Sequence, residues 1–296
     1  MADDRIARIR NFNRVITRRL GVLEASFLGG GLSLGKARLL YEIASGVTEV
    51  RQLRAKLGLD SGQMSRMLRS LEHKRLIETV ADPADARARV VRVTRAGRAK
   101  LDKLESKTNE GVEAWLSALS PALQARFVAA TEEIVHLLDA SEISIRPEDP
   151  QSDEARWCLE QFFQELAARF ETGFDPRLTA SATPAEMTPP NGIFLLATLP
   201  DRPVGCVAFK RLSDDGKIAE IKRMWVSPSM RGLGVARRLL LSLEAQARQA
   251  GAKVLRLSTN GALTEAQTFY RASGFYEIPL FDDDPYAQLA LEKRLD

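Results

Sequence analysis

The sequence predicts two domains: a helix-rich domain with one short strand pair, followed by an α/β domain around a mixed sheet. The chain has 296 residues, more than a single hydrophobic core usually serves. Apolar residues in the first half recur at helical spacing, whereas the second half alternates short β-favouring runs with helical segments. The pattern changes at the proline- and acid-rich stretch SEISIRPEDPQSDEA. We therefore expect domains over 1–141 and 142–296.

Composition narrows the class of protein. Hydrophobic residues make up 45% and charged residues 28%, as in soluble globular proteins. Apolar runs fall short of the roughly 20 residues that a membrane span needs, and the charged N-terminus resembles no signal peptide. Two cysteines speak against a disulfide framework, and two histidines lie in no metal-ligand spacing. We expect a cytoplasmic protein with no membrane partner and no metal site.

Positive charge is concentrated in the first half. Residues 1–145 have a net charge of +6 and residues 146–296 a net charge of −2. Within 51–107 there are 15 basic and 7 acidic side chains. A polyanion is therefore the partner expected for the first domain, although a solvated basic face has the same composition.

The first domain begins with helical segments. Residues 6–28 show apolar side chains at helical spacing up to the glycines at 29–31, and Ser33 is placed to cap a helix over 34–45. Thr48 can cap a short helix that ends at Gly58. Two further helices are expected over 98–118 and 121–139.

A second short helix follows Gly58 after a tight turn. Met64, Met67, Leu68 and Leu71 lie on one face of it, at the spacing of a buried helical stripe. The other face presents small polar and arginine side chains, including Gln63, Ser65, Arg66 and Arg69. This arrangement suits a helix that reads the DNA major groove, and an ordinary amphipathic helix pair fits it equally well.

The next segment favours the DNA-binding interpretation. LIETV and VVRVT predict a hairpin whose tip carries Arg87 and Arg89, suited to a narrow minor groove. Here the sequence resembles the MarR family of winged helix-turn-helix regulators, whose wing signature D-x-R-x-x-x-V-x-[LV]-T-x-x-G runs from Asp85 to Gly97. The resemblance covers roughly 5–140. It implies a homodimer built from the first and the last two helices of this half, bound to double-stranded DNA at a pseudo-palindromic operator, with Asp85 orienting Arg87.

The second half predicts strands separated by helices. A strand over 143–146 and a helix over 152–170 precede a proline-rich loop at 176–192. GIFLLATL, VGCVAFKRL, KIAEIKRMWV, KVLRLST and YAQLALEKRL predict five more strands. Helices are expected after the third and fourth of these five, so the half is α/β.

Two glycines open the helix that follows Pro228. Gly232 and Gly234 sit in SPSMRGLGVARRLL, although glycine disfavours a helix interior. A glycine-rich turn at a helix N-terminus can hold phosphate, because backbone N–H groups and the helix dipole both face the anion. The loop lacks G-x-G-x-x-G and a Gly-Lys-Ser/Thr ending, which disfavours a Rossmann site and excludes a Walker A loop.

At this loop the sequence resembles the GNAT superfamily of acetyltransferases over roughly 143–295. Its acetyl-CoA signature [QR]-x-x-G-x-[GA] falls on Arg231, Gly234 and Ala236, with Gly232 and Val235 in the same turn. Asn260 at the exit of the next strand also matches, as does AQTFYRASGF with Tyr270. The resemblance implies acetyl-CoA as co-substrate, with its pyrophosphate on the loop amides, and acetyl transfer to an amine.

The resemblance also implies site roles. The Val226 N–H would hold the thioester oxygen, and Tyr270 would protonate the leaving thiolate; packing alone is the other interpretation of Tyr270. Glu220 matches the position of the base, directly or through water, and a solvated strand-end acid is an equal alternative. An amine with a pKa near ~10.4 needs such a base before it can attack.

The acceptor and the coupling of the two halves stay open. The acidic loop FDDDPY (281–286) and the basic pair Lys222 and Arg223 are clues to the acceptor, and neither decides between a small amine and a protein lysine. The leading hypothesis is a DNA-binding regulator fused to an active acetyltransferase. The alternatives are a regulator whose second half only senses acetyl-CoA or another ligand, and an acetyltransferase whose first half only dimerises.

Overall fold

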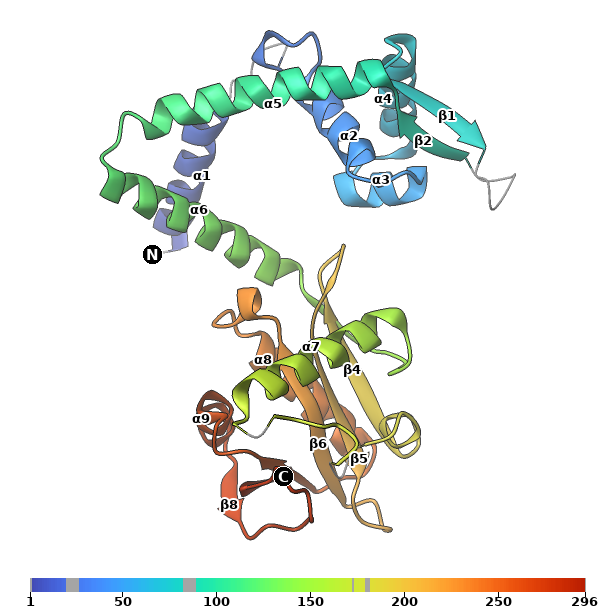
Figure 1. The fold of residues 1–296 in the computed structure, drawn as a ribbon, viewed down its shortest axis with the longest axis vertical. Helices are drawn as coiled ribbons and strands as arrows, with labels where there is room; N and C mark the ends of the chain where they lie inside the picture. Colours follow the sequence, from blue (N-terminus) through green and yellow to red (C-terminus); the bar gives the residue numbers. More distant parts are fainter. Residues whose placement is uncertain (1, 20–26, 82–88, 172, 179–181, 296) are drawn as a thin grey trace. The chain divides into compact units, whose positions relative to one another are not determined.

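The computed structural model describes residues 2–19, 27–81, 89–171, 173–178 and 182–295 (Figure 1). The chain forms two compact units, residues 1–127 and 128–296. Helix α6 (Pro121–Glu142) spans the division between them. The boundary expected after residue 141 lies in the last turn of this helix and stays a prediction. Among the described residues, none of the helices is long and apolar enough to cross a membrane.

The first unit is helical with one hairpin, which confirms the predicted fold class. Helices α1 (Ala2–Arg19), α2 (Leu34–Ala44), α3 (Val50–Leu57) and α4 (Ser61–His73) precede strands β1 (Ile77–Ala81) and β2 (Arg89–Val93). Helices α5 (Arg95–Leu116) and α6 follow. Their core contains Leu39, Leu40, Leu53, Met64 and Leu71, each at most 1% exposed.

Two local predictions in this unit were wrong in detail. The described part of the helix expected over 6–28 runs from Ala2 to Arg19, and residues 20–26 lie outside the described residues. Phe27–Gly29 form a 3₁₀ turn, so the expected α-helix does not extend to residue 28. The N-cap of α3 is Glu49 rather than Thr48, and no side chain caps that helix. Gly58 ends α3 in the left-handed conformation (φ 61°), as expected for a C-terminal glycine.

The last residues of the wing signature, Thr94 and Gly97, connect the hairpin to α5. The Thr94 hydroxyl caps α5 by accepting from the Gly97 N–H at 3.0 Å and donates to the Arg75 carbonyl at 2.7 Å. A Cβ at Gly97 would lie 2.0 Å from the Leu76 carbonyl oxygen, so only glycine permits this approach. The tip of the hairpin, with Asp85 and Arg87, lies outside the described residues.

The second unit contains a mixed sheet, as predicted, with seven strands in the part that the structure describes rather than the six expected. Its strands are β3 (Ser144–Pro147), β4 (Gly192–Thr198), β5 (Pro203–Arg211), β6 (Ile218–Val226), β7 (Val254–Thr259), β8 (Tyr276–Ile278) and β9 (Leu289–Arg294). The order is β3-β4-β5-β6-β7-β9-β8, and only β6 and β7 pair in parallel in the described sheet. Strand β8 was not anticipated from the sequence, and β3 begins one residue later than expected.

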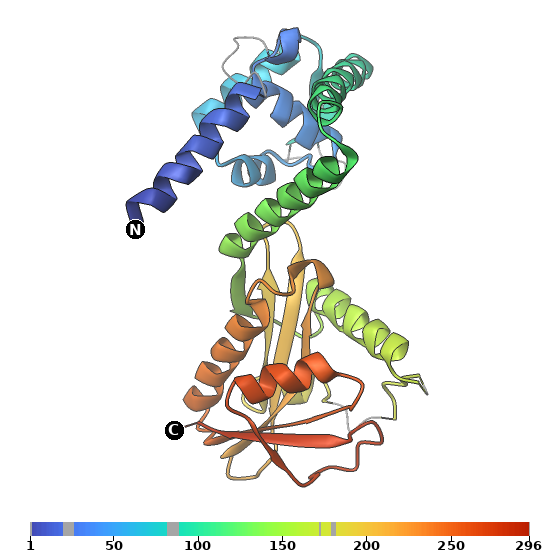
Figure 2. The ribbon, with the colours of Figure 1, turned by 90° about the vertical axis from the view of Figure 1, so that its left-hand side faces the viewer.

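Helices cover both faces of this sheet (Figure 2). Helix α7 (Asp153–Arg169) packs on one face, where Cys158 contacts the cluster around Phe194 and Cys206. Helix α8 (Val235–Gln249) packs on the other face through Leu239, Leu240 and similar residues. Strands buried on both faces read as nearly continuous apolar runs, which explains GIFLLATL in β4.

Strands β6 and β7 separate partway along their length. Their pairing covers Ile218–Val254, Ala219–Leu255 and Glu220–Arg256 and ends there. Residues 221–226 of β6 and 257–259 of β7 continue as strands without pairing to each other. Helix α9 (Thr264–Ala272) follows β7. The separation leaves one edge of β6 open where the functional residues were predicted.

Candidate active site

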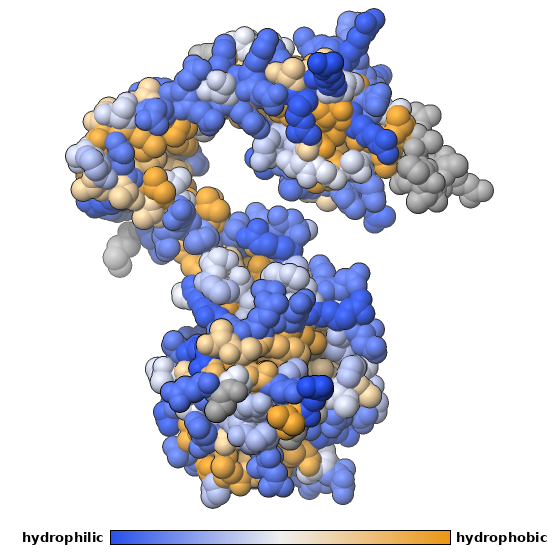
Figure 3. Space-filling view, in the orientation of Figure 1, coloured by the Kyte–Doolittle hydropathy of each residue, from blue (hydrophilic) through white to orange (hydrophobic). Residues whose placement is uncertain are grey.

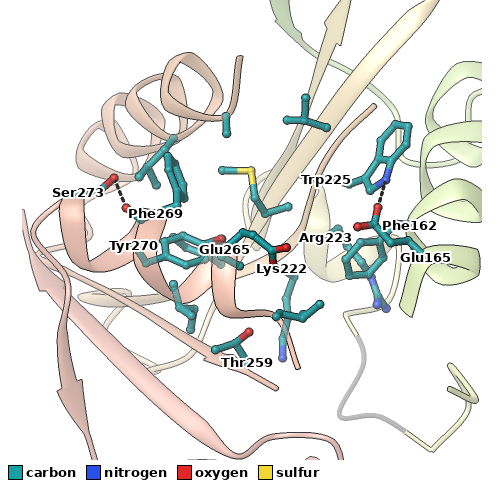
Figure 4. A pocket seen from close by; sticks show the side chains of 18 of the residues that line it. Phe162, Glu165, Lys222, Arg223, Trp225, Thr259, Glu265, Phe269, Tyr270 and Ser273 are labelled. Carbon is teal, nitrogen blue, oxygen red and sulfur yellow. Dashed lines mark hydrogen bonds between the residues drawn. The ribbon is translucent and has the colours of Figure 1, made fainter. Parts of the chain in front are cut away.

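A cavity of about 910 Å³ lies between the separated ends of β6 and β7 (Figure 4). Its volume is in the range of small-molecule sites. Tyr270 lines this cavity. All the predicted cofactor residues line it as well, namely Val226, Arg231, Gly232, Gly234, Val235, Ala236 and Asn260. Glu220 is not among its lining residues.

The backbone conformation explains the two loop glycines. Gly232 and Gly234 both have φ of 78°, which side chains other than glycine rarely adopt. Gly234 is the N-cap of α8, and no side chain caps that helix. A Cβ at either glycine would meet no described atom within 4 Å, so the space over the loop is open. The first N–H groups of α8 are therefore available to an anion.

Arg231 holds the end of β6 in place. Its Nε donates to the Val226 carbonyl at 3.0 Å, and its Nη2 lies 2.5 Å from a Glu165 carboxylate oxygen on α7. The N–H and C=O of a strand residue lie on the same edge, so the Val226 N–H also faces away from β5. This is the open edge of β6.

Tyr270 lies on α9 and is 5% exposed. Its ring packs against Phe269 and Phe275, with centroids 5.2 and 5.3 Å away, and Figure 4 places it among the cavity side chains. Its hydroxyl makes no hydrogen bond within the described part of the chain. Burial raises the pKa of the Tyr270 hydroxyl well above its usual value. The phenol therefore keeps its proton at neutral pH and can donate it.

Glu220 lies in β6 and is 2% exposed, which excludes the solvated strand-end acid. Its Oε1 lies 2.5 Å from Lys222 Nζ, and its Oε2 lies 3.9 Å from Lys210 Nζ. Burial raises the pKa of the Glu220 carboxyl, while the two ammonium groups oppose that rise. Lys222 lines the cavity, so the carboxyl sits one side chain behind the cavity wall.

The Asn260 side chain makes hydrogen bonds within the protein. Its amide donates to the Tyr286 carbonyl at 2.9 Å, and its oxygen accepts from the Ala262 N–H at 2.9 Å. Asn260 therefore ties the exit of β7 to the loop that precedes β9. The acidic loop contributes to the same wall, because Asp284 and Tyr286 both line the cavity.

Helix α7 supplies a wall that no motif predicted. Glu165 accepts from Trp225 Nε1 at 3.0 Å and pairs with Arg231, and Arg169 pairs with Glu265 of α9 at 2.6 Å. Aromatic side chains complete this wall, namely Phe162, Phe170, Phe174 and Tyr286. The only sequence signal was the helical spacing of Glu165 and Arg169, which many surface helices share.

The proposed DNA-reading face lies on α4. Ser65, Arg66 and Arg69 are exposed, whereas Met64 and Leu71 are buried and Met67 and Leu68 pack against the core. Gln63 is exposed too, but its side chain accepts from the Asp60 N–H at 3.4 Å in a capping box. Arg89 begins β2, and Arg87 falls outside the described residues.

Helices α1 and α6 present apolar side chains to solvent. Ile6, Ile9, Phe12 and Val15 on α1 are 41–62% exposed. Helix α6 has no buried residue, and six of its large apolar side chains are exposed, namely Leu123, Phe127, Val128, Val135, Leu137 and Leu138. Apolar side chains are visible on the surface over this helix (Figure 3). Such faces mark protein–protein contacts.

Comparison with known proteins assigns the two regions. The model of the acetyltransferase (GNAT) family matches residues 154–275. An IAA acetyltransferase of Azospirillum brasilense is 30% identical over 133 residues, covering 45% of this chain and 84% of that protein. The chain belongs to the GNAT acetyltransferase family. The model of the MarR family matches residues 30–88, so the chain joins a MarR region to its GNAT region.

Two further proteins are similar to parts of this GNAT family member. An aminoalkylphosphonate N-acetyltransferase of Salmonella typhimurium is 35% identical over 94 residues, covering 31% of this chain and 61% of that protein. The solved structure of a probable transcriptional regulator from Pseudomonas aeruginosa is 24% identical, with a TM-score of 0.37, and the match covers 45% of this chain and 99% of that one. The matches to the two family models confirm both predicted resemblances at the level of family.

Proposed function

We propose that this protein is bifunctional, an acetyl-CoA-dependent N-acetyltransferase and a dimeric DNA-binding transcriptional regulator. The enzyme half rests on one observation above all. The parallel strands β6 and β7 part beneath an uncapped helix N-terminus whose two glycines have positive φ. The resulting cavity reaches from that loop to Tyr270.

The residues present fit acetyl-CoA. The free N–H groups of Gly234, Val235 and Ala236 suit a pyrophosphate, and the glycines leave the approach open. Arg237, in the first turn of α8, is exposed at the cavity and adds positive charge there. The open edge of β6 offers backbone groups to an extended chain, as a neighbouring strand would.

Acetyl-CoA supplies the acetyl group as a thioester. The Val226 N–H holds the carbonyl oxygen as negative charge develops on it. The Tyr270 hydroxyl donates its proton to the departing sulfur, and Glu220 accepts the amine proton through water at Lys222. Arg231 and Asn260 act by positioning, because their side chains bond to the backbone at the end of β6 and at the β7 exit.

The acceptor is a small-molecule amine. The Salmonella relative is named for an aminoalkylphosphonate, which is a small amine, and this supports a small acceptor over a protein lysine. The aromatic side chains of the cavity wall suit a small ligand that is shielded from water when it binds.

The regulator half rests on α4 and on the exposed apolar faces. Ser65, Arg66 and Arg69 are exposed on α4 and can meet base edges or phosphates. We expect Arg87 and Arg89 at the flanking minor groove. Pairing of two copies through α1 and α6 places two recognition helices against a pseudo-palindrome with half-sites roughly 10 bp apart.

The enzyme half is tested by incubating the protein with acetyl-CoA and a panel of amines and identifying N-acetylated products by mass spectrometry. Binding of acetyl-CoA in calorimetry without any product would favour a ligand sensor.

The regulator half is tested by DNA selection, followed by a salt series on the selected site and on scrambled DNA. Affinity should fall steeply with salt, and Arg87→Ala should reduce the salt slope by about one unit on both DNAs. Arg156→Ala removes the same charge from an exposed side chain on α7 and serves as the control. Equal, weak binding of the wild type to both DNAs would contradict the regulator function and favour a first unit that only dimerises.

A further inference from the structure

A bulge in β6 places Arg223 in the cavity. The β5–β6 register shifts between Cys206 and Ala208, so that Arg223 and Met224 together stand opposite Val207. Arg223 has φ of 60°, in the left-handed region that favours glycine. The Cys206 thiol donates to its carbonyl at 3.2 Å and helps to fix the bulge. Strained residues of this kind persist where the surroundings hold them, and they gather at binding sites.

Aromatic rings fix the Arg223 side chain. Its guanidinium lies over the Phe163 ring, 4.7 Å from the centroid, and 5.8 Å from the Phe162 centroid (Figure 4 labels Arg223 and Phe162). Burial lowers the pKa of Arg223, opposed by Cys206 and by the Asp284 and Glu220 carboxylates. A guanidinium stays charged in proteins and has five N–H donors, so it can hold a protein acceptor and a ligand oxyanion together.

Four other basic side chains of the cavity are paired with carboxylates. Arg231 lies 2.5 Å from Glu165, Arg169 lies 2.6 Å from Glu265, and Lys293 lies 2.6 Å from Glu244. Lys222 is likewise paired with Glu220. The first three pairs connect different elements of the protein, whereas Lys222 and Glu220 both lie in β6.

We propose that Arg223 binds an oxyanion of the acceptor, and that the acceptor is therefore a small amine carrying a carboxylate or a phosphonate. The stacked, planar fork suits two parallel hydrogen bonds to either group. Phe170, Phe174 and Tyr286, whose ring centroids lie 4.9–5.8 Å apart, form the apolar wall for the rest of the molecule. This assignment rests on the proposed acetyltransferase function and makes Arg223 its specificity residue.

The test compares kcat/KM for amines that differ only in the anion. The pairs are phenylalanine with 2-phenylethylamine, and 3-aminopropylphosphonate with propylamine. The wild type should prefer the anionic member of at least one pair by about ten- to a hundredfold, the worth of a hydrogen bond to a charged group. The pair that shows the preference identifies the oxyanion as carboxylate or phosphonate.

Arg223→Gly removes the side chain and suits a φ of 60°, so the backbone keeps its conformation. It should abolish the preference while transfer to the neutral amines persists, and Arg223→Lys should restore only part of it. The matched control is Arg256→Ala, which removes an arginine stacked on Phe281 outside the cavity and should keep the preference. A wild type without preference, or a preference that survives Arg223→Gly, would overturn the oxyanion site alone. Absence of transfer to every amine would overturn the acetyltransferase proposal as well.

Discussion

Tyr270 keeps its proton at neutral pH because burial raises the pKa of its hydroxyl. Tyr270→Phe removes the hydroxyl and keeps the ring packed between Phe269 and Phe275. We expect kcat to fall about 10²–10⁴-fold, with a much smaller change in acetyl-CoA affinity. Steady-state kinetics and calorimetry check this. Wild-type turnover in the variant would mean that Tyr270 only packs.

Glu220 should govern the acid limb of the pH profile. Burial raises the pKa of its carboxyl, so the ionised form that accepts a proton appears only at a higher pH than for an exposed glutamate. Activity is therefore lost as the pH falls through this raised pKa. Glu220→Gln should lower kcat about 10²–10⁴-fold and remove that limb. If the acid limb of kcat against pH were unchanged in Glu220→Gln, another group would be the base.

Sequence reasoning could identify Glu220 but not its surroundings. Lys222 lies two residues further along the same strand and was recognisable as a neighbour on the same face. Lys210 comes from β5, and it meets Glu220 only through the strand register, which no local pattern encodes. The burial of Glu220 and the strained conformation of Arg223 both depend on that register.

At the level of elements, the N-terminus of α8 is the part that the sequence predicted best. The glycine spacing indicated a turn that exposes backbone N–H groups, and the structure has positive φ at both glycines. The α7 wall was missed because its members are brought to the cavity by packing on the sheet, and ordinary surface helices have similar patterns. Strand β8 is three residues long, too short to give a period.

Gly234→Val should weaken acetyl-CoA binding about tenfold or more, because a β-branched residue disfavours φ of 78° and its side chain projects into the open space over the loop. Gly251 is the matched control, since it has φ of 91°, follows α8 at the opposite end, and also has open space at its Cβ. Gly234→Val and Gly251→Val should each lower the free energy of unfolding by about 1–2 kcal/mol. Only Gly234→Val should change the calorimetric affinity, and equal effects would exclude the phosphate role.

The apolar faces of α1 and α6 should hold two copies together. Ile9→Asp places a charge where an apolar contact is expected, so sedimentation should show a shift towards monomer and weaker operator binding. Asn11→Asp introduces the same residue at an exposed polar position of the same helix and should leave the dimer intact. A dimer that survives Ile9→Asp at micromolar concentration would place the interface elsewhere.

At the scale of the whole molecule, the net positive charge and the cavity lie in different halves of the chain. Residues 1–145 carry a net positive charge suited to DNA, and residues 146–296 carry the cavity with a small net negative charge. Family-level features of both regions were readable because their signatures are local in sequence. The acceptor could not be predicted from the sequence, since the proposed acceptor site combines residues of β6, α7 and the loop before β9.

The central claim is that the cavity transfers an acetyl group from acetyl-CoA to an amine. The most direct measurement is the rate of thiol release from acetyl-CoA by the wild-type chain, with and without each amine of the panel. We predict release that requires both protein and amine, that saturates with each, and that is nearly lost in Tyr270→Phe. Saturable acetyl-CoA binding with no amine-dependent thiol release from any member of the panel would contradict the claim.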